Sequence, residues 1–128
     1  MKTGNMRKIL LVSLIALVAF GCKKNQLGGK STVSGTVKHH AKAIANAVVY
    51  IKFNAKEFPG NDVSAYDDKV TADAAGNYSI KCYKGDYYLY AVGYDYAIAP
   101  PYTVVGGSPV HIRTKESVTI DLAVTEGD

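Results

Sequence analysis

Residues 70–94 contain the pattern that most constrains how this chain folds. They read VTADAAGNYSIKCYKGDYYLYAVGY, and two short segments within them, 73–77 and 84–86, are rich in Gly, Asn and Asp. These residues tolerate positive φ angles or bond to their own backbone, as tight turns require. Between and after the turns, hydrophobic and polar residues alternate, which is typical of a strand with one face in a core. The stretch therefore predicts three β-strands joined by two tight turns.

The alternation also predicts which side chains of these strands face the core. We expect the inner face to hold Tyr78, Ile80, Cys82, Tyr87, Leu89 and Ala91. The opposite face would then carry Ser79, Lys81, Tyr83, Tyr88, Tyr90 and Val92. At an inner position, Cys82 would act as a small buried hydrophobic residue.

The first residues of the chain are typical of a secretion signal. Three cations, Lys2, Arg7 and Lys8, precede a hydrophobic run at residues 9–20. A helix that spans a bilayer needs about 20 apolar residues, so this run is too short to span but suits a signal peptide. It ends in residues 17–22, LVAFGC, which resemble the lipobox of bacterial lipoproteins.

The lipobox resemblance implies that residues 1–21 are removed and that Cys22 is lipidated and becomes the mature N-terminus. An ordinary secretion signal with Cys22 just after its cleavage site is the alternative. In Gram-negative lipoproteins an Asp directly after the lipidated Cys favours the inner membrane, and Lys23 occupies that position here. The resemblance therefore implies anchoring in the outer membrane through the lipid. Because no acidic cluster follows Cys22, the periplasmic face is preferred over the cell surface.

Polar residues and two glycines fill positions 23–31, KKNQLGGKS, which predicts a flexible tether. Nine such residues have an r.m.s. reach of roughly 15–18 Å. Segment 22–31 would thus hold a domain at residues 32–128 close to its membrane.

The mature chain has almost no net charge. The whole chain has 15 basic and 11 acidic residues, and three of the cations leave with the signal, so 12 basic residues remain against 11 acidic ones. The resulting formal charge of +1 gives no indication of binding to nucleic acid or to anionic lipid. With Cys22 lipidated, Cys82 remains alone, and no intramolecular disulfide can form.

About 97 residues follow the tether, enough for one small domain with a single core. Beyond the stretch described above, alternating hydrophobic residues predict strands at residues 33–37, 47–53, 109–114 and 117–125. The first strand of that stretch, the third of the domain, is expected at residues 68–73. Loops are expected at residues 39–46, with room for one helical turn, and at residues 54–66 and 95–107. Seven short strands separated by turns predict an all-β fold, a seven-stranded antiparallel β-sandwich.

Several of these strands carry motifs of a known family. VSGTV at residues 33–37, DAAGNYSI at 73–80 and GDYYL at 85–89 follow the order and spacing of the carboxypeptidase regulatory-like domain. Residues 32–124 therefore resemble that family, whose members share a transthyretin-like (prealbumin-like) Greek-key sandwich. Such domains are usually non-catalytic appendages beside peptidases, transport receptors or adhesins. The resemblance implies a fold and a non-enzymatic role.

Candidate catalytic and metal-binding residues are few. His39 and His40 are adjacent and point apart in an extended chain, and no Cys or carboxylate stands at a zinc-ligand spacing from them or from His111. We expect all three to be exposed loop residues. The acids Asp62, Asp67, Asp68 and Asp73 are expected in turns and at strand edges. No catalytic triad or phosphate-binding loop is recognisable, so no enzyme activity, metal or cofactor is predicted.

Ten tyrosines are the most unusual feature of the composition. Four of them, Tyr50, Tyr83, Tyr88 and Tyr90, fall on outward faces. There they could form cross-strand aromatic pairs, or they could form a ring-rich surface that stacks on glycans or docks a protein, since Tyr has an apolar body with a polar tip. The sequence leaves both readings open.

A second group of aromatic and proline residues follows the fifth predicted strand. If each strand crosses the sandwich and turns back, loops 39–46, 74–77 and 95–107 gather at the end far from the tether, and loops 54–66, 83–86 and 115–116 gather at the near end. Loops on a rigid scaffold often carry binding sites. We therefore predict a partner-binding site formed by Tyr94, Tyr96, Pro100, Pro101 and Tyr102. The alternative is that these rings fold down and close the core.

Taken together, these patterns favour a non-enzymatic lipoprotein whose sandwich serves as an interaction or structural module in the cell envelope. The alternative is a lipoprotein that binds a glycan or small ligand as an accessory of an outer-membrane uptake system. The partner is thus an envelope protein or a glycan, and nucleic acid is not expected.

Overall fold

The computed structural model describes residues 23–126. The predicted signal peptide at residues 1–21 and the predicted lipidation site, Cys22, lie outside them. The described residues form nine strands and one 3-10 helix: β1 (Leu27–His39), β2 (Lys42–Ala43), β3 (Val48–Phe53), η1 (Val63–Ala65), β4 (Asp68–Thr71), β5 (Asn77–Cys82), β6 (Gly85–Tyr94), β7 (Thr103–Ile112), β8 (Ser117–Thr119) and β9 (Leu122–Ala123). Within this range, no helix has the length and apolar character that crossing a bilayer requires.

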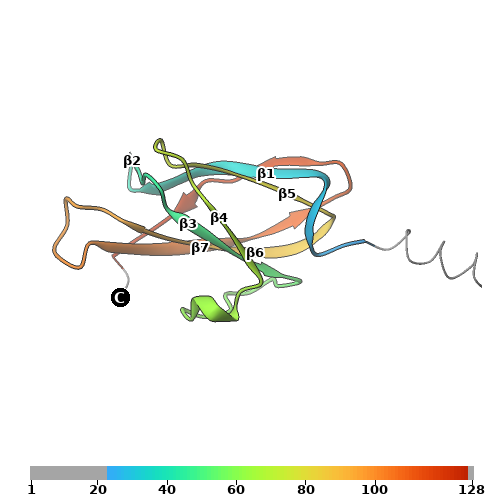
Figure 1. Ribbon diagram of the computed structural model, residues 1–128, viewed down its shortest axis with the longest axis horizontal. Coiled ribbons are helices and arrows are strands. Elements are labelled where there is room, and N and C mark those ends of the chain that lie inside the picture. The colour runs from blue at the N-terminus through green and yellow to red at the C-terminus, as the bar shows by residue number, and fades with distance from the viewer. Residues whose placement is uncertain (1–22, 127–128) are drawn as a thin grey trace, which may run out of the picture.

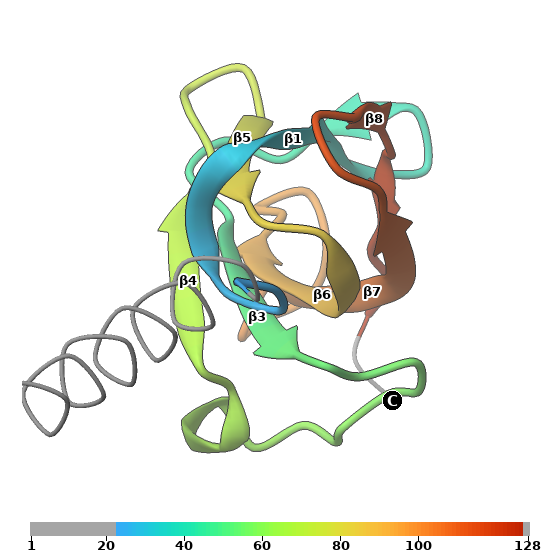
Figure 2. The same cartoon turned by 90° about the vertical axis from the view of Figure 1, so that its right-hand side faces the viewer.

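Two sheets pack face to face and form a β-sandwich, as predicted (Figures 1 and 2). One sheet has the strand order β4-β3-β6-β7, and its neighbouring strands are antiparallel. In the other, β1 pairs antiparallel with β5 and with the short β2. β8 and β9 also pair with β1, but in parallel. The all-β sandwich is confirmed, but the described residues form nine strands where seven were predicted, and the expectation of antiparallel pairing throughout is wrong at β8 and β9.

The predicted strand at residues 117–125 is divided in two at Asp121. The backbone N–H of Ile120 still donates to the carbonyl of Ser34 in β1. The next donor of β1, the N–H of Thr36, instead bonds to the Asp121 carboxylate at 3.0 Å. Backbone pairing resumes at Leu122. A side chain thus satisfies one position of the ladder, and a pattern of alternating hydrophobic residues cannot reveal this.

The predicted inner faces of β5 and β6 are confirmed. Their inward residues are buried in one core: Tyr78, Ile80, Cys82, Tyr87, Leu89 and Ala91. Burial raises the pKa of the Cys82 thiol, in agreement with its predicted role as a small hydrophobic residue. The alternating pattern therefore assigned the core side of these two strands correctly.

Gly35, the centre of the VSGTV motif, lies where β1 passes close to Ile120. A Cβ atom added to Gly35 would lie 1.9 Å from the Ile120 carbonyl oxygen, so only glycine permits this approach. The hydroxyl of Tyr78 donates to the same carbonyl. The motif residue thus allows the C-terminal strands to pack against β1.

Two segments expected to be loops belong to strands. β1 begins at Leu27, and β7 begins at Thr103 and pairs with β6 from there to Ile112. The loop predicted at residues 95–107 therefore spans only residues 95–102. Glycines had suggested loops in both places, but Gly106 is required inside its strand, because a Cβ there would lie 2.1 Å from the carbonyl oxygen of Ala123. The connection at residues 39–46 is likewise a hairpin containing β2, with no helical turn.

The predicted flexible tether at residues 23–31 is also wrong. Residues from Leu27 onward belong to β1, and the residues before them are bonded to the β5–β6 turn. The N–H of Asn25 donates to the carbonyl of Lys84 at 2.9 Å, and the Asn25 side chain accepts from the N–H of Asp86 at 3.0 Å. The N–H of Tyr83 donates to the carbonyl of Gln26 at 2.9 Å. The sandwich therefore begins almost immediately after position 22.

Residues 54–66 form a loop that lies over the outer face of the β4-β3-β6-β7 sheet (Figure 1). We had expected this loop at the near end of the sandwich. Its Phe58 ring lies 5.7 Å from that of Tyr88 and 5.4 Å from that of Tyr90, and the Tyr66 ring stacks on Tyr90 at 5.6 Å. We call Phe58, Tyr66, Tyr88 and Tyr90 the covered aromatic cluster.

The loop buries two tyrosines that were predicted to face outward into solvent. Tyr88 and Tyr90 point away from the main core, yet they are only 8% and 4% exposed. The same cover, together with the neighbouring tyrosines, raises the pKa of Tyr66 to about 12. Tyr50 pairs directly with Tyr90 across β3 and β6, and the centroid of its ring lies 6.0 Å from that of Tyr66. These contacts favour the structural reading of the outward tyrosines of β3 and β6.

Candidate functional site

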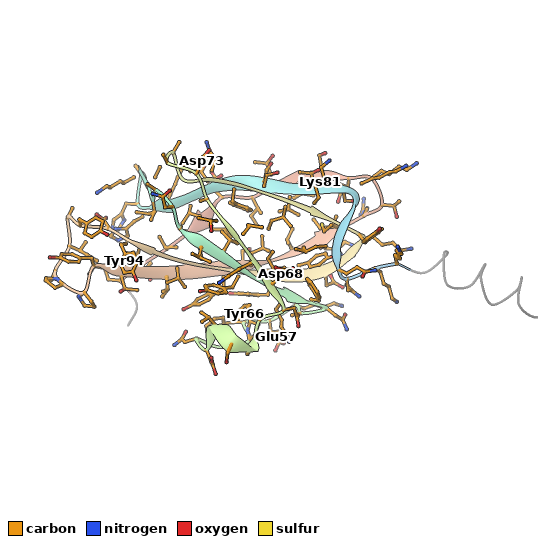
Figure 3. All side chains as sticks on the ribbon, in the orientation of Figure 1. Glu57, Tyr66, Asp68, Asp73, Lys81 and Tyr94 are labelled. Carbon is orange, nitrogen blue, oxygen red and sulfur yellow. The ribbon has the colours of Figure 1, made fainter. Side chains whose placement is uncertain are left out.

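The loop between β6 and β7 lies at the end of the sandwich opposite the chain entry, where Figure 3 places Tyr94. Tyr94 pairs with Thr103 as the last residue pair of the two strands. The loop then closes on itself through three backbone bonds: from Asp95 N–H to the Tyr102 carbonyl (2.8 Å), from Tyr102 N–H to the Ala99 carbonyl (3.1 Å) and from Ile98 N–H to the Asp95 carbonyl (3.2 Å). It is therefore an ordered extension of the β6–β7 hairpin, at the end predicted from the sequence.

Three tyrosine rings lie side by side on this loop. Tyr94 and Tyr96 are 55% and 75% exposed, and their rings are nearly parallel with centroids 6.3 Å apart. The Tyr102 ring lies 5.2 Å from that of Tyr96 at an angle of 53°. Pro100 and Pro101 are exposed in the same loop. We call these five residues the aromatic loop; they are the site residues predicted from the sequence.

A buried polar cluster attaches the aromatic loop to the sandwich. Asp95 is only 4% exposed, and its carboxylate lies 2.7 Å from Nδ1 of His39. It also accepts hydrogen bonds from Nζ of Lys42 at 2.8 Å and from the N–H of Ala97 at 3.0 Å. These bonds, the one with His39 first, hold the pKa of Asp95 well below its usual range. The loop is thus attached to the β1–β2 hairpin by an ion pair and not by its tyrosines.

His39 was predicted to be an exposed loop residue, and this expectation is wrong, since it is 6% exposed. The reason is that β1 continues to His39, which lies two residues beyond Val37 on the same inward face. His40 and His111 are exposed as expected, and His111 pairs with Asp86 at 2.8 Å. The partners His39 and Asp95 are 56 positions apart, so no local sequence signal joins them.

A hydrophobic residue of the loop closes this end of the core. Ile98 is half-buried and packs against the core cluster, while the rings of Tyr94 and Tyr96 remain outside. The alternative prediction, in which these rings fold down over the core, does not match their exposure. One side chain of the loop therefore does the packing, and the exposed rings are left available for contact with a ligand.

A shallow hollow of about 600 Å³ lies beside the aromatic loop. Five of its seven lining residues have polar or charged side chains: His39, His40, Lys42, Asp95 and Glu126. Carboxylate, ammonium and imidazole groups can all hydrogen-bond to hydroxyl groups of a ligand. The far end of the sandwich thus combines exposed aromatic faces with an adjacent polar hollow.

Nothing in residues 23–126 resembles a metal site, since this range contains no group of three or more His, Cys, Asp or Glu side chains placed to hold an ion. The acids expected in turns and at strand edges have those roles. Asp62 accepts from the N–H and hydroxyl of Ser64 at the start of η1. Asp73 closes its turn by accepting from the N–H groups of Ala75 and Asn77.

No protein-family model matches this chain, and no curated protein matches it significantly. Among solved structures, the chain is similar to a "putative carbohydrate binding protein" from Pseudomonas aeruginosa, with a TM-score of 0.54, 12% identity and coverage of 81% of this chain and 93% of the other. It is also similar to a DUF3823 family protein from Parabacteroides merdae, with a TM-score of 0.46, 15% identity and coverage of 77% of this chain and 47% of the other. The first likeness shows a shared β-sandwich fold. Membership of the carboxypeptidase regulatory-like family stays a prediction.

Proposed function

We propose that this chain is a non-enzymatic lipoprotein of the bacterial cell envelope whose sandwich binds a carbohydrate through the aromatic loop. In this proposal the lipid on Cys22 anchors the protein in the outer membrane, with the periplasmic face preferred. The sandwich is a carboxypeptidase regulatory-like domain that presents the loop away from the membrane. The observation that carries the proposal is the row of rings on a loop fixed by Asp95: Tyr96 lies between Tyr94 and Tyr102, and the rings of Tyr94 and Tyr96 are more than half exposed.

The chemistry of the aromatic loop suits a sugar. A pyranose ring has an apolar face of C–H groups that stacks on an aromatic ring, and its hydroxyl groups need hydrogen-bond partners. Tyrosine supplies both a face and a polar tip. The polar hollow beside the loop adds charged and imidazole groups within the same end of the molecule. The Pseudomonas aeruginosa protein, which shares the fold, is described as a "putative carbohydrate binding protein", and this agrees with a sugar ligand. The geometry of the aromatic loop is the main support for a sugar ligand.

A protein partner in the envelope is the second candidate. Its supporting observation is the combination of exposed aromatic rings and two exposed prolines, because aromatic residues are enriched in the centres of protein interfaces. In that case the sandwich would serve as an interaction or structural module. Selective binding to a polysaccharide separates the two candidates.

The binding proposal is tested on an array of bacterial and plant polysaccharides and host N- and O-glycans, using residues 22–128 with Cys22→Ser. We expect selective binding that falls at least about tenfold in the double variant Tyr96→Ser, Tyr102→Ser, which removes two stacking faces. Val63→Ser is the control, since it removes an exposed hydrophobic side chain from another surface. No selective binding to any glycan would reject the carbohydrate, and equal loss in the control would reject the loop as its site.

The anchor is tested separately in cells. Radioactive palmitate should label the wild-type protein, and Cys22→Ala should abolish both the label and normal removal of residues 1–21. Unchanged labelling of the variant would show that Cys22 is not the lipidated residue.

A further inference from the structure

The end of the sandwich next to the chain entry carries an excess of positive charge (Figure 2 looks onto this end). Three segments meet there: the entry residues with the start of β1, the β5–β6 turn and the β7–β8 turn. They are joined by hydrogen bonds, since Thr32 N–H donates to the Glu116 carbonyl at 2.9 Å and the Ser31 hydroxyl donates to the Arg113 carbonyl at 2.7 Å. Together the segments bring six exposed cations to one end: Lys23, Lys24, Lys30, Lys84, Arg113 and Lys115.

These six cations have no acidic partner among residues 23–126, because none of them takes part in a salt bridge there. The two acids at this end bond to groups other than these cationic side chains: Asp86 pairs with His111, and Glu116 accepts from the backbone N–H of Arg113. Six cations thus face two acids at this end, while the remaining described residues hold six cations and eight acids. The small net charge of the mature chain conceals this separation of charge.

The cations surround a hollow of about 750 Å³. No acidic residue lines this hollow, and four of its lining residues are lysines: Lys23, Lys30, Lys84 and Lys115. The Tyr83 ring forms part of the lining, and Nζ of Lys23 lies 5.7 Å from its centroid. A concave surface lined by ammonium groups favours phosphate groups over neutral ligands.

The position of this end in the chain indicates which phosphates it would meet. Asn25, which is bonded to the β5–β6 turn, is three positions from residue 22, and an extended chain of three steps spans about 10 Å. If Cys22 is lipidated, as the proposed function holds, the basic end lies within about 10 Å of the membrane surface. The aromatic loop lies at the opposite end of the sandwich (Figure 3).

We propose that this basic end docks on the anionic phospholipid headgroups of the membrane that holds the anchor. Docking would use Lys84 and Lys115 with their neighbours to contact phosphate groups, and it would hold the sandwich upright so that the aromatic loop points away from the lipid. The inference rests on the proposed anchor for its place in the cell. The binding it asserts is a property of the folded domain and can be measured without the lipid.

The test is sedimentation with vesicles, using residues 22–128 with Cys22→Ser, which contain every element from β1 to β9. We expect binding to vesicles of phosphatidylglycerol and phosphatidylcholine at low salt, and none to phosphatidylcholine alone. Each basic residue near an anionic surface contributes about a fivefold gain in binding, so Lys84→Gln with Lys115→Gln should weaken it by about 10- to 30-fold. The matched control, Lys56→Gln with Lys69→Gln, removes two exposed lysines elsewhere and should retain binding within about twofold.

Three outcomes would overturn the inference: no binding to anionic vesicles at low salt, equal losses in the two double variants, or complete competition by inorganic phosphate at constant ionic strength. The last result would indicate a site for free phosphate and not for a membrane surface. Failure here is distinct from failure of the anchor. If the protein incorporates palmitate but does not bind anionic vesicles, the anchor is supported and the docking surface is rejected. If it binds anionic vesicles but does not incorporate palmitate, the docking surface is supported and the anchor is rejected.

Discussion

Two groups of aromatic rings in this sandwich have similar composition and opposite surroundings. In the covered aromatic cluster, Tyr88 and Tyr90 lie on the outer face of a sheet and are nearly inaccessible, because loop 54–66 lies over them. In the aromatic loop, Tyr94 and Tyr96 follow on the same chain segment and are more than half exposed. The neighbouring loop, and not residue type or strand position, therefore decides whether a tyrosine here serves stability or is free to bind.

The two groups also differ in how they are held. Loop 54–66 is held through its rings, since Phe58 and Tyr66 pack directly on Tyr90. The aromatic loop is held through a buried carboxylate, Asp95, and through Ile98. The rings of Tyr88 and Tyr90 that receive this loop are covered and cannot also contact a ligand. Attachment by other side chains leaves rings available, which is why the aromatic loop is the better binding candidate.

The largest effect should come from the inner face of the strand that carries both groups. Leu89 lies in the main core beneath the covered cluster, so Leu89→Ala should lower the free energy of unfolding by about 2–5 kcal/mol. Lys81→Ala, on the outer face of β5, should change it by less than about 0.5 kcal/mol. Chemical denaturation measures both, and exchanged effects would mean that the two faces are reversed.

The second prediction tests whether the covered aromatic cluster is structural. Tyr90→Ala should lower the free energy of unfolding by about 2–4 kcal/mol, because it removes a buried ring and the surface on which loop 54–66 packs. The same substitution at Tyr96 should cost less than about 0.5 kcal/mol. Equal costs in urea denaturation would remove the distinction between the two groups of rings.

A smaller, pH-dependent effect should distinguish the attachment of the aromatic loop. The pKa of Asp95 is held below its usual value by His39, Lys42 and the N–H of Ala97. Its carboxylate therefore contributes stability that is fully present above the unfolded pKa of about 3.9 and is lost as the pH falls through the lower folded pKa. Between pH 5 and pH 2 the wild type should lose stability more steeply than Asp95→Asn.

Thermal denaturation over that pH range measures this difference, with Asp68→Asn as the control at an exposed carboxylate. The control should follow the wild-type profile. Parallel profiles for wild type and Asp95→Asn would show that the hydrogen bonds of the Asp95 carboxylate do not make folding depend on pH.

Much of the fold could be predicted because it depends on local patterns. The alternation at residues 78–82 and 87–91 gave the correct core side, and the order of strands and turns indicated the sandwich. Strand ends were less predictable. Gly106 has the composition of a loop, yet it is needed where Ala123 approaches the strand, and this contact is visible only in three dimensions.

Some features of the candidate site could likewise be predicted from the sequence, and others could not. All five residues of the aromatic loop could be chosen from the sequence, because they share one connection between strands. The bond of Asp95 to His39 and the cover over Tyr90 could not, because each joins residues far apart in the chain. The concentration of cations near the chain entry also could not be predicted, since the net charge of a sequence does not show which cations lie together in the fold.

The proposed function requires that the rings of the aromatic loop are free for a ligand and are not part of the core. Equilibrium denaturation of the double variant Tyr96→Ser, Tyr102→Ser beside the wild type tests this requirement. We expect a change of less than about 1 kcal/mol in the free energy of unfolding, because Tyr96 is 75% exposed, Tyr102 is not part of the core cluster, and Asp95 and Ile98 still hold the loop. A loss of about 3 kcal/mol or more, the size expected for a buried ring, would show that the tyrosines belong to the core.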